Sequence, residues 1–424
     1  MSRSNLLLLG IVLSVLSSAT VHASTLNETQ KLTAPDAQAG DVFGTSVGIS
    51  GSTAIVGAEW DDDAGRDAGS AYIFDITTGN QVAKLTATDA DHYDQFGWSA
   101  AISGNTAIVG SIFDDDGAFK AGSAYLFDAT TGSQIAKLTA PDPGTTDLFG
   151  NSVTIDGDKA IVGALQHDGA YVGSGAAYLF DATTGALIRE YTPDDPGLGD
   201  KFGSSVAMSG NTAIIGASLD DGVHTDSGSA YVFDVTTGDQ LFKLTASDPG
   251  QRQEFGHSVA INGNIAVVGA RDSFSNTGSA YIFDLTTGNE LFKLATPDPE
   301  SGDYFGMSVA TNGSIAIVGA SYDDYNTDRA GKAYVYDTST GNLLHILSAS
   351  DGAQVDQFGG AMAISGDTVI IGAWTDDDAG DSSGSAYVFN NIPEPATLAV
   401  IMIGSLAMLR RVDYSSHTNN SARF

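Results

Sequence analysis

The sequence repeats one unit of about 50 residues seven times. A Phe-Gly pair opens each copy, and successive pairs lie 53 residues apart except for one interval of 50. The phenylalanines of these pairs are Phe43, Phe96, Phe149, Phe202, Phe255, Phe305 and Phe358. A constant period is typical of a chain in which each copy buries its apolar face against its neighbours. The repeat therefore outweighs the two or three domains that a length of 424 residues would otherwise suggest.

Two further glycine markers recur in phase with the Phe-Gly pairs. In the first copy they are Gly57, which is followed by Ala, and Gly69, which begins a Gly-x-Ala-Tyr motif. Glycine-containing tight turns separate short apolar or alternating segments, and no stretch of the repeats has a helical period. Each copy is therefore predicted to form four β-strands, which in the first copy lie at residues 46–49, 54–56, 71–74 and 82–85.

Seven four-stranded units predict an all-β fold, a seven-bladed β-propeller. The segment Gln30-Lys31-Leu32-Thr33-Ala34 is similar to the fourth strand of the copies, and the last copy stops after its third strand at Asn390. We therefore predict that an N-terminal strand completes the last blade and closes the ring, which leaves no open sheet edge. The predicted propeller domain covers residues 24–391.

The three markers together resemble the FG-GAP repeat of integrin α-subunit propellers and of many secreted bacterial proteins, over residues 30–390. The integrin-like version carries an Asp-rich calcium loop between the first and second strands of a blade. Here that position holds short turns such as Ser103-Gly104-Asn105. The calcium site of that version is therefore not expected in this chain.

The N-terminus has the three parts of a secretory signal. Arg3 provides the charge, residues 6–16 are apolar, and Val21-His22-Ala23 fits the cleavage rule. The apolar run is short for a membrane anchor. We therefore predict that residues 1–23 are a signal peptide and that the protein is exported.

The C-terminus resembles the PEP-CTERM sorting signal of Gram-negative bacteria. Its parts are Pro393-Glu394-Pro395, an apolar run and Arg410-Arg411, in that order. The resemblance implies recognition of residues 392–411 by an exosortase, a membrane protease-transpeptidase, after brief contact with the membrane. The polar tail 412–424 would then be removed, and the protein would be secreted or displayed on the cell surface.

The chain is strongly acidic, with 52 Asp and Glu against 18 Lys and Arg and a net charge of −34. This charge disfavours nucleic acid and anionic lipid as partners. The absence of cysteine excludes disulfides and thiolate chemistry. By strand direction, the loops between second and third strands should share one face with the loops that join blades, and these loops hold 37 of the 52 acids.

Paired aspartates follow the second glycine in five copies and suggest calcium, a hard cation that prefers oxygen ligands. The alternative is a solvated face that keeps the protein soluble. The corresponding loops of copies three and five hold one acid each and are expected to hold no calcium. The candidate ligands are Asp61, Asp63, Asp67, Asp114, Asp116, Asp220, Asp226, Asp323, Asp328, Asp376, Asp378 and Asp381.

No catalytic set is predicted. Gly44-Thr45-Ser46-Val47-Gly48 matches a hydrolase nucleophile motif as a string, but its serine belongs to the repeat and no helix follows. The histidines at 92, 167, 224, 257 and 345 are scattered and are expected on the surface. The first hypothesis is a non-enzymatic binding or adhesion propeller that contacts an extracellular protein or polysaccharide. The alternatives are a structural matrix or biofilm component and, third, a polysaccharide-active enzyme.

Overall fold

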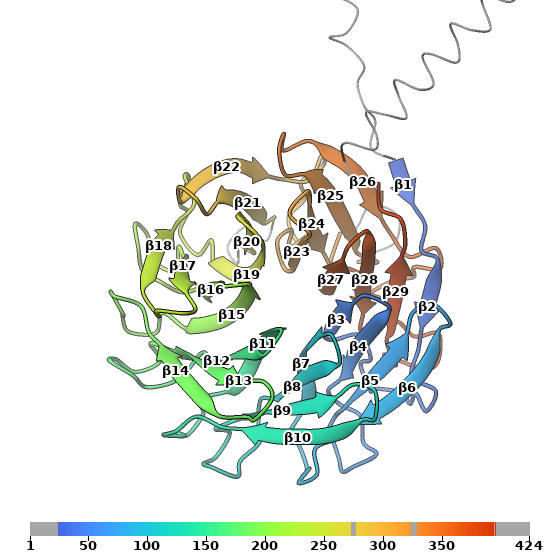
Figure 1. Cartoon of the computed structure of the whole chain (residues 1–424). Helices are drawn as coiled ribbons and strands as arrows, with labels where there is room; N and C mark the ends of the chain where they lie inside the picture. The colour runs from blue at the N-terminus through green and yellow to red at the C-terminus, as the bar shows by residue number, and fades with distance from the viewer. Residues whose placement is uncertain (1–23, 273–276, 324–328, 394, 396–424) are drawn as a thin grey trace, which may run out of the picture.

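The computed structural model is a closed ring of seven β-sheets, or blades, around a central axis (Figure 1). It describes residues 24–272, 277–323, 329–393 and 395. The predicted all-β, seven-bladed propeller is confirmed. No helix within the described ranges is both long and apolar enough to cross a membrane.

Each blade has four antiparallel strands, numbered outward from the channel. Blade 1 comprises β3 (Val47–Ser50), β4 (Thr53–Ala58), β5 (Ser70–Asp75) and β6 (Asn80–Leu85). Blades 2 to 4 comprise β7 (Phe96–Ser103), β8 (Thr106–Ser111), β9 (Ser123–Asp128) and β10 (Ser133–Leu138); β11 (Phe149–Asp156), β12 (Lys159–Ala164), β13 (Ala176–Asp181) and β14 (Leu187–Tyr191); and β15 (Phe202–Ser209), β16 (Thr212–Ala217), β17 (Ser229–Asp234) and β18 (Gln240–Leu244). Blades 5 and 6 comprise β19 (Phe255–Asn262), β20 (Ile265–Ala270), β21 (Ser279–Asp284) and β22 (Asn289–Leu294); and β23 (Val309–Thr311), β24 (Ile315–Ala320), β25 (Lys332–Asp337) and β26 (Leu343–Leu347).

Blade 7 is completed by the N-terminal strand, as predicted. It consists of β27 (Ala361–Ser365), β28 (Thr368–Ala373), β29 (Ser385–Phe389) and β2 (Gln30–Leu32), which pairs antiparallel with β29. An additional strand that was not predicted, β1 (Ser24–Leu26), adds a parallel fifth strand to blade 6 beside β26. The N-terminal segment therefore ties blade 6 to blade 7.

The Phe-Gly phenylalanines are core residues, as expected. Phe43 is fully buried and packs edge-on against Tyr72 and Phe74, with ring centroids 5.5 and 5.9 Å apart. The same pair of aromatic contacts recurs in every blade. The hydrophobic clusters lie between blades, because one of them joins Ile73 and Leu85 of blade 1 to Phe96 of blade 2.

Neighbouring blades also interlock through backbone at the three glycine markers. A Cβ atom on Gly57 of blade 1 would lie 2.1 Å from the carbonyl oxygen of Gly97 in blade 2, and one on Gly69 would lie 2.0 Å from that of Phe96. Gly97 in turn packs on the carbonyl oxygen of Ser70. No larger residue fits at these positions without moving the blades apart.

The closing junction between blades 7 and 1 has the same geometry as the others. A Cβ atom on Gly372 would lie 2.0 Å from the Gly44 carbonyl oxygen, and the Phe43 amide donates to the Ser383 carbonyl at 3.0 Å. The ring therefore closes through the same contacts that hold every other pair of blades.

We predict that Gly372→Ala strongly destabilises the propeller. The φ angle of Gly372 is not left-handed, so the effect would come from the clash of its Cβ with Gly44, and overpacking of this kind costs about 3 kcal/mol or more. The control is Gly250→Ala, whose nearest neighbour would be 3.9 Å away. Thermal unfolding followed by circular dichroism compares the two, and equal melting temperatures would contradict the interlock.

Candidate functional site

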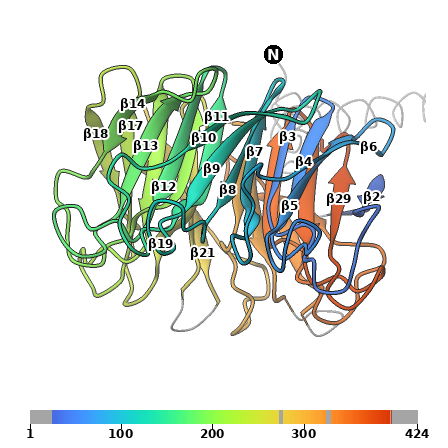
Figure 2. The ribbon, with the colours of Figure 1, turned by 90° about the horizontal axis from the view of Figure 1, so that it is seen from below.

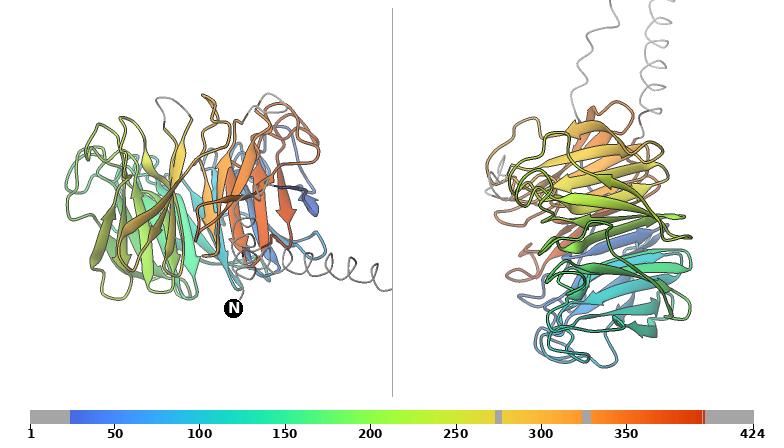
Figure 3. Two further views of the ribbon diagram at one scale, coloured as in Figure 1. Left: turned by 90° about the horizontal axis from the view of Figure 1, so that it is seen from above. Right: turned by 90° about the vertical axis from the view of Figure 1, so that its left-hand side faces the viewer.

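The long loops gather on one side of the ring, as Figure 2 shows and Figure 3 repeats from other directions. We call this side the loop face; it consists of the loops between second and third strands and the loops that join blades. The two kinds of loop contact each other, because the Tyr93 amide donates to the Arg66 carbonyl at 2.8 Å and the Thr146 amide to the Phe119 carbonyl at 2.9 Å. The shared face deduced from strand direction is confirmed.

The first aspartate of each predicted pair is buried rather than open to solvent. Asp61 is 2% exposed, and its Oδ2 accepts a hydrogen bond from the Tyr72 hydroxyl at 2.5 Å. Tyr72 is the tyrosine of the Gly-x-Ala-Tyr motif, so this motif supplies both core packing and a hydrogen-bond donor. The same bond joins Tyr125 to Asp114, Tyr231 to Asp220, Tyr334 to Asp323 and Tyr387 to Asp376.

A lysine from the fourth strand lies among these carboxylates. Lys84 Nζ in blade 1 lies 2.8 Å from Asp36, 2.9 Å from Asp61 and 2.6 Å from Asp63. The same three-carboxylate arrangement surrounds Lys137 in blade 2 and Lys31 in blade 7, and Lys243 in blade 4 contacts two carboxylates. We call each such group a lysine–aspartate cluster. The sequence signal was the Lys-Leu pair at the end of the fourth strands, which the sequence analysis left unused.

The electrostatics of the cluster keep its members charged. Burial alone would lower the pKa of Lys84, but hydrogen bonds to Asp36, Asp63 and Asp61 raise it above its usual value. The Asp36 carboxyl is partly buried, yet its bonds to Lys84 and Tyr72 lower its pKa. Burial and the carboxylate of Asp61 raise the pKa of Tyr72, which stays a hydrogen-bond donor.

The three remaining blades satisfy the same position by other means. In blade 3, His167 replaces the buried aspartate and lies 3.0 Å from Asp147. In blade 5, Gln253 donates to the Tyr281 hydroxyl at 2.6 Å. In blade 6, the lysine comes from the third strand, because Lys332 binds Asp323.

The predicted calcium ligands thus fall into two groups. Asp61, Asp63 and their equivalents Asp114, Asp116, Asp220, Asp376 and Asp378 contact a fourth-strand lysine, and Asp323 contacts Lys332. Asp67 and Asp226 lie apart near the loop ends, where their amides donate to Asp62 and Asp221. The Asp381 carbonyl accepts from the Gly40 amide, and Asp328 lies outside the described residues. Within the described ranges no three His, Asp or Glu side chains form a group suited to a metal ion. Calcium binding stays a prediction.

We predict that Lys84→Met creates a calcium-responsive cluster. The variant leaves Asp36, Asp61 and Asp63 without their cation, which should cost about 2–3 kcal/mol of stability near pH 7. Calcium at about 10 mM should restore part of the lost melting temperature, because extracellular calcium sites are often weak.

Lys159→Met, at a strand lysine outside the clusters, is the matched control. Sodium chloride at equal ionic strength separates screening from binding, and an equal response of Lys84→Met to both salts would argue against a cation site. For the unchanged protein, melting temperatures in calcium, in magnesium and in sodium chloride at equal ionic strength test whether the predicted sites bind calcium.

A second set of buried carboxyls recurs two residues before the Phe-Gly phenylalanine. Asp94 is 5% exposed, and its Oδ2 accepts a hydrogen bond from the Asp91 amide at 2.8 Å. Burial is the largest cause that raises the pKa of these groups to about 6 each, in Asp41, Asp94, Asp200 and Asp356. In the unfolded chain an aspartate titrates near about 3.9.

These shifts predict a propeller that is more stable at about pH 5 than at about pH 7.5. A raised folded-state pKa contributes stability below about pH 4, and this contribution is lost as the pH rises through about 6. Carboxyls with lowered pKa, such as Asp36, oppose the gain only below about pH 4. Burial lowers the pKa of His257 and His345, and these two groups oppose the gain below about pH 6.5. The four aspartates outnumber them, so the melting temperature should still rise between about pH 7.5 and 5.

Asp94→Asn tests the cause, because the amide oxygen still accepts from Asp91 but no longer titrates. It should reduce the pH response, whereas Asp239→Asn at an exposed turn should not. A melting temperature that falls steadily below about pH 7.5 would contradict the assignment.

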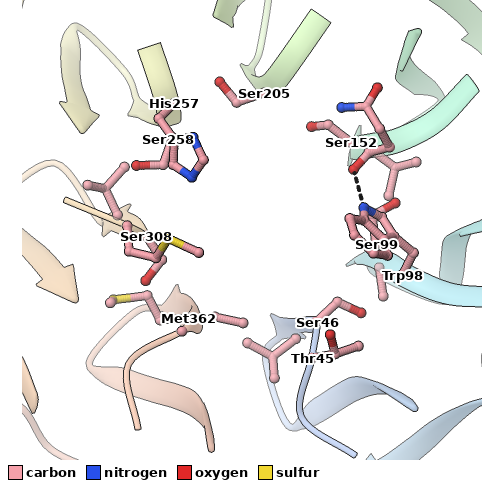
Figure 4. Close-up of a pocket in the computed structure, with 18 of the residues that line it drawn as sticks. Thr45, Ser46, Trp98, Ser99, Ser152, Ser205, His257, Ser258, Ser308 and Met362 are labelled. Atoms are coloured by element: carbon pink, nitrogen blue, oxygen red, sulfur yellow. Dashed lines mark hydrogen bonds between the residues drawn. The ribbon is translucent and has the colours of Figure 1, made fainter. Parts of the chain in front are cut away.

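The second candidate site is the central channel, where the three residues after each of the seven Phe-Gly pairs surround a cavity of about 390 Å³ (Figure 4). The lining residues form three rings, with one residue from each blade in each ring. The first ring, toward the loop face, holds the residue after each Phe-Gly pair. The second ring is mostly serine, and the third is mostly valine. The first ring varies from blade to blade and comprises Thr45, Trp98, Asn151, Ser204, His257, Met307 and Gly360.

The channel serines are structural hydrogen-bond donors. Ser46 Oγ donates to the Gly97 carbonyl of the next blade at 2.7 Å, and Ser258 Oγ donates to the Gly306 carbonyl at 2.9 Å. The corresponding serines at 99, 205 and 308 bond in the same way. Their protons are held by carbonyl groups, so Ser46 of the nucleophile-like string joins blades and has no base to activate it.

The expectation of surface histidines was wrong for three of them. His167 and His345 are 6% and 4% exposed, and His345 bonds to Ser24 of β1. His257 belongs to the first ring of the channel, where burial, with smaller effects of Arg271 and Lys201, lowers its pKa to about 3. Single histidines carry no periodic signal, so the sequence could not place them.

The geometry defines a repeat protein of the seven-bladed β-propeller class. The family model of the FG-GAP repeat matches the chain seven times, at residues 26–74, 80–127, 133–180, 189–233, 239–283, 289–336 and 344–389. The chain therefore belongs to the FG-GAP repeat family. Each match begins near the fourth strand of one blade and ends near the third strand of the next, which is the register that closes the ring. No curated protein was found to match the chain.

Proposed function

We propose that this chain is an exported, non-enzymatic binding propeller that holds an extracellular protein or polysaccharide on its loop face. FG-GAP propellers are typically binding or structural domains, which supports this class. The predicted signal peptide lies outside the described residues, as does the PEP-CTERM-like segment except for Ile392, Pro393 and Pro395. Their sequences motivate export and display on the surface of a Gram-negative cell.

The observation that carries the proposal is a gathering of exposed apolar side chains on the loop face of blades 1 to 4. Such residues are depleted from ordinary acidic surfaces, and aromatic side chains within a polar rim are typical of interfaces. Described residues in the hairpins of the opposite face contribute none of the large exposed hydrophobics. The exposed residues in these loops are Trp60, Tyr93, Phe119, Tyr171, Val172, Leu198 and Val223.

The charge around these side chains indicates the character of the partner. The same loops hold most of the acids, and the lysine–aspartate clusters bury only one carboxylate per cluster. A partner with apolar groups and basic or cation-bridged groups would complement this surface.

We predict that Phe119→Ser combined with Tyr171→Ser weakens binding to the partner at least about tenfold, because exposed aromatic residues carry much of the energy of interfaces. Phe119 and Tyr171 are 61% and 54% exposed, so the fold should not suffer. Immobilised extracellular polysaccharides and proteins are screened with the full chain, with and without calcium.

Val82→Ser combined with Ile135→Ser, on outer strands at the rim, is the matched control. Equal, saturable binding by both double variants would exclude the loop face. Association that never saturates and needs calcium would instead support the matrix component.

A further inference from the structure

In most blades only the three residues that follow the Phe-Gly pair line the cavity, but in blades 1, 6 and 7 the residue after β4, β24 or β28 lines it as well. These three residues are Glu59, Ser321 and Trp374. In blade 7 the first ring is Gly360, and a Cβ there would lie 3.4 Å from Trp374 Nε1. The missing side chain is what uncovers Trp374.

Two polar groups in this sector have no hydrogen-bond partner within the described residues. Glu59 is 2% exposed, and its Oε2 is unpartnered; the indole Nε1 of Trp374 is unpartnered as well. The two residues follow corresponding strands of neighbouring blades. A buried polar atom without a partner costs free energy that a ligand can recover.

Blade 5 shows how the repeat normally satisfies a charge at this position. Its equivalent of Glu59 is Arg271, which pairs at 2.7 Å with Glu254, the residue before the Phe-Gly phenylalanine. In blade 1 that residue is Val42, which offers no polar side chain. The unpartnered carboxyl of Glu59 is thus a departure from the repeat. It lies beside blade 7, which departs from the repeat at Gly360 and Trp374.

The chemistry of the sector selects the ligand. Hydroxyl groups of one ligand can donate to Glu59 and accept from the Trp374 indole, and would give both groups a partner. Trp98, whose own indole N–H donates to Asn151, presents a ring that is 38% exposed to the apolar face of a ligand. We propose that the channel between blades 7 and 1 binds a neutral sugar residue.

The charge and size of the cavity agree with this ligand. Burial raises the pKa of Glu59 to about 8, so near pH 7 its carboxyl is largely protonated, and His257 is also uncharged. A volume of about 390 Å³ lies in the lower part of the range of about 300–1,000 Å³ for small-molecule sites. One or two sugar rings would fit. The site is separate from the loop tips of the proposed function, so either can fail alone.

Tryptophan fluorescence tests the proposal directly. The chain has three tryptophans, and two of them, Trp98 and Trp374, line the cavity. In a Trp60→Phe background, the full chain is titrated to about 50 mM with glucose, galactose, mannose, xylose, N-acetylglucosamine, maltose and cellobiose, because millimolar affinity is expected of so small a ligand. At least one sugar should give a saturable change.

Variants then assign the contacts. Trp374→Phe keeps the ring but removes the N–H, and should weaken binding at least about tenfold. Glu59→Gln keeps a donor and an acceptor and should change affinity by less than about threefold, whereas Glu59→Leu should abolish binding. If Trp374→Phe melts early, Gly360→Val replaces it; this variant fills the space beside the indole, keeps the indole N–H in the chain and should also abolish binding.

Choline and butylammonium chloride are the competing probes. Saturation by these cations alone, with loss in Glu59→Gln, would overturn the proposal in favour of a cation site. A channel that responds saturably to neither class would overturn it as well. Loss of sugar binding in the loop-face double variant would show that the fluorescence does not report the channel.

Discussion

The contact between glycines and carbonyl oxygens of neighbouring blades is the constraint on which the rest of the propeller depends. Because Gly57 and Gly69 lie against the backbone of the next Phe-Gly pair, backbone contacts set how closely the blades approach each other. The residue before each phenylalanine has a left-handed φ, from 53° to 58°, although its side chain ranges from Val42 to Lys201. Such strain persists only when the surrounding packing imposes it.

This constraint leaves the channel free to vary. The first ring contains aromatic, amide, imidazole, thioether and hydroxyl side chains and one glycine, yet every member directly follows a Phe-Gly pair. Five serines of the next ring donate to carbonyl groups of the next blade and add to the spacing, whereas Ser152 accepts from the Val206 amide. Blade 7 has Ala361 in place of this serine, and its first-ring residue is Gly360.

The fold was predictable because its determinants recur, whereas the sites depend on departures from the repeat. Phe43, Gly57 and Gly69 return in phase, so their spacing predicted strands, blades and closure. Lys84 also recurs, but the calcium prediction considered only the aspartates and not the lysine that lies among them. Glu59, Trp374 and His257 each occur once, and no period identifies them. The strand β1 has no counterpart in any copy and could not be inferred from the repeat.

The lysine–aspartate clusters show how an acidic repeat stabilises a face that carries most of its negative charge. A buried carboxylate is costly unless it is paired and hydrogen-bonded. In four blades the repeat provides a lysine and a tyrosine, and in blade 6 it takes the lysine from β25. Blade 3 exchanges both partners, because His167 stands where the others have aspartate and Glu190 where they have lysine.

The exchange keeps groups of opposite charge at the two positions, because a hydrogen bond to Asp147 and the charge of Glu190 both raise the pKa of His167. Asp67 and Asp226 lie outside the clusters, and each has an arginine 3.8 Å away, Arg66 and Arg252 respectively. A partner or cation attracted to the loop face would first meet the exposed acids that lie beyond the clusters, such as Asp62.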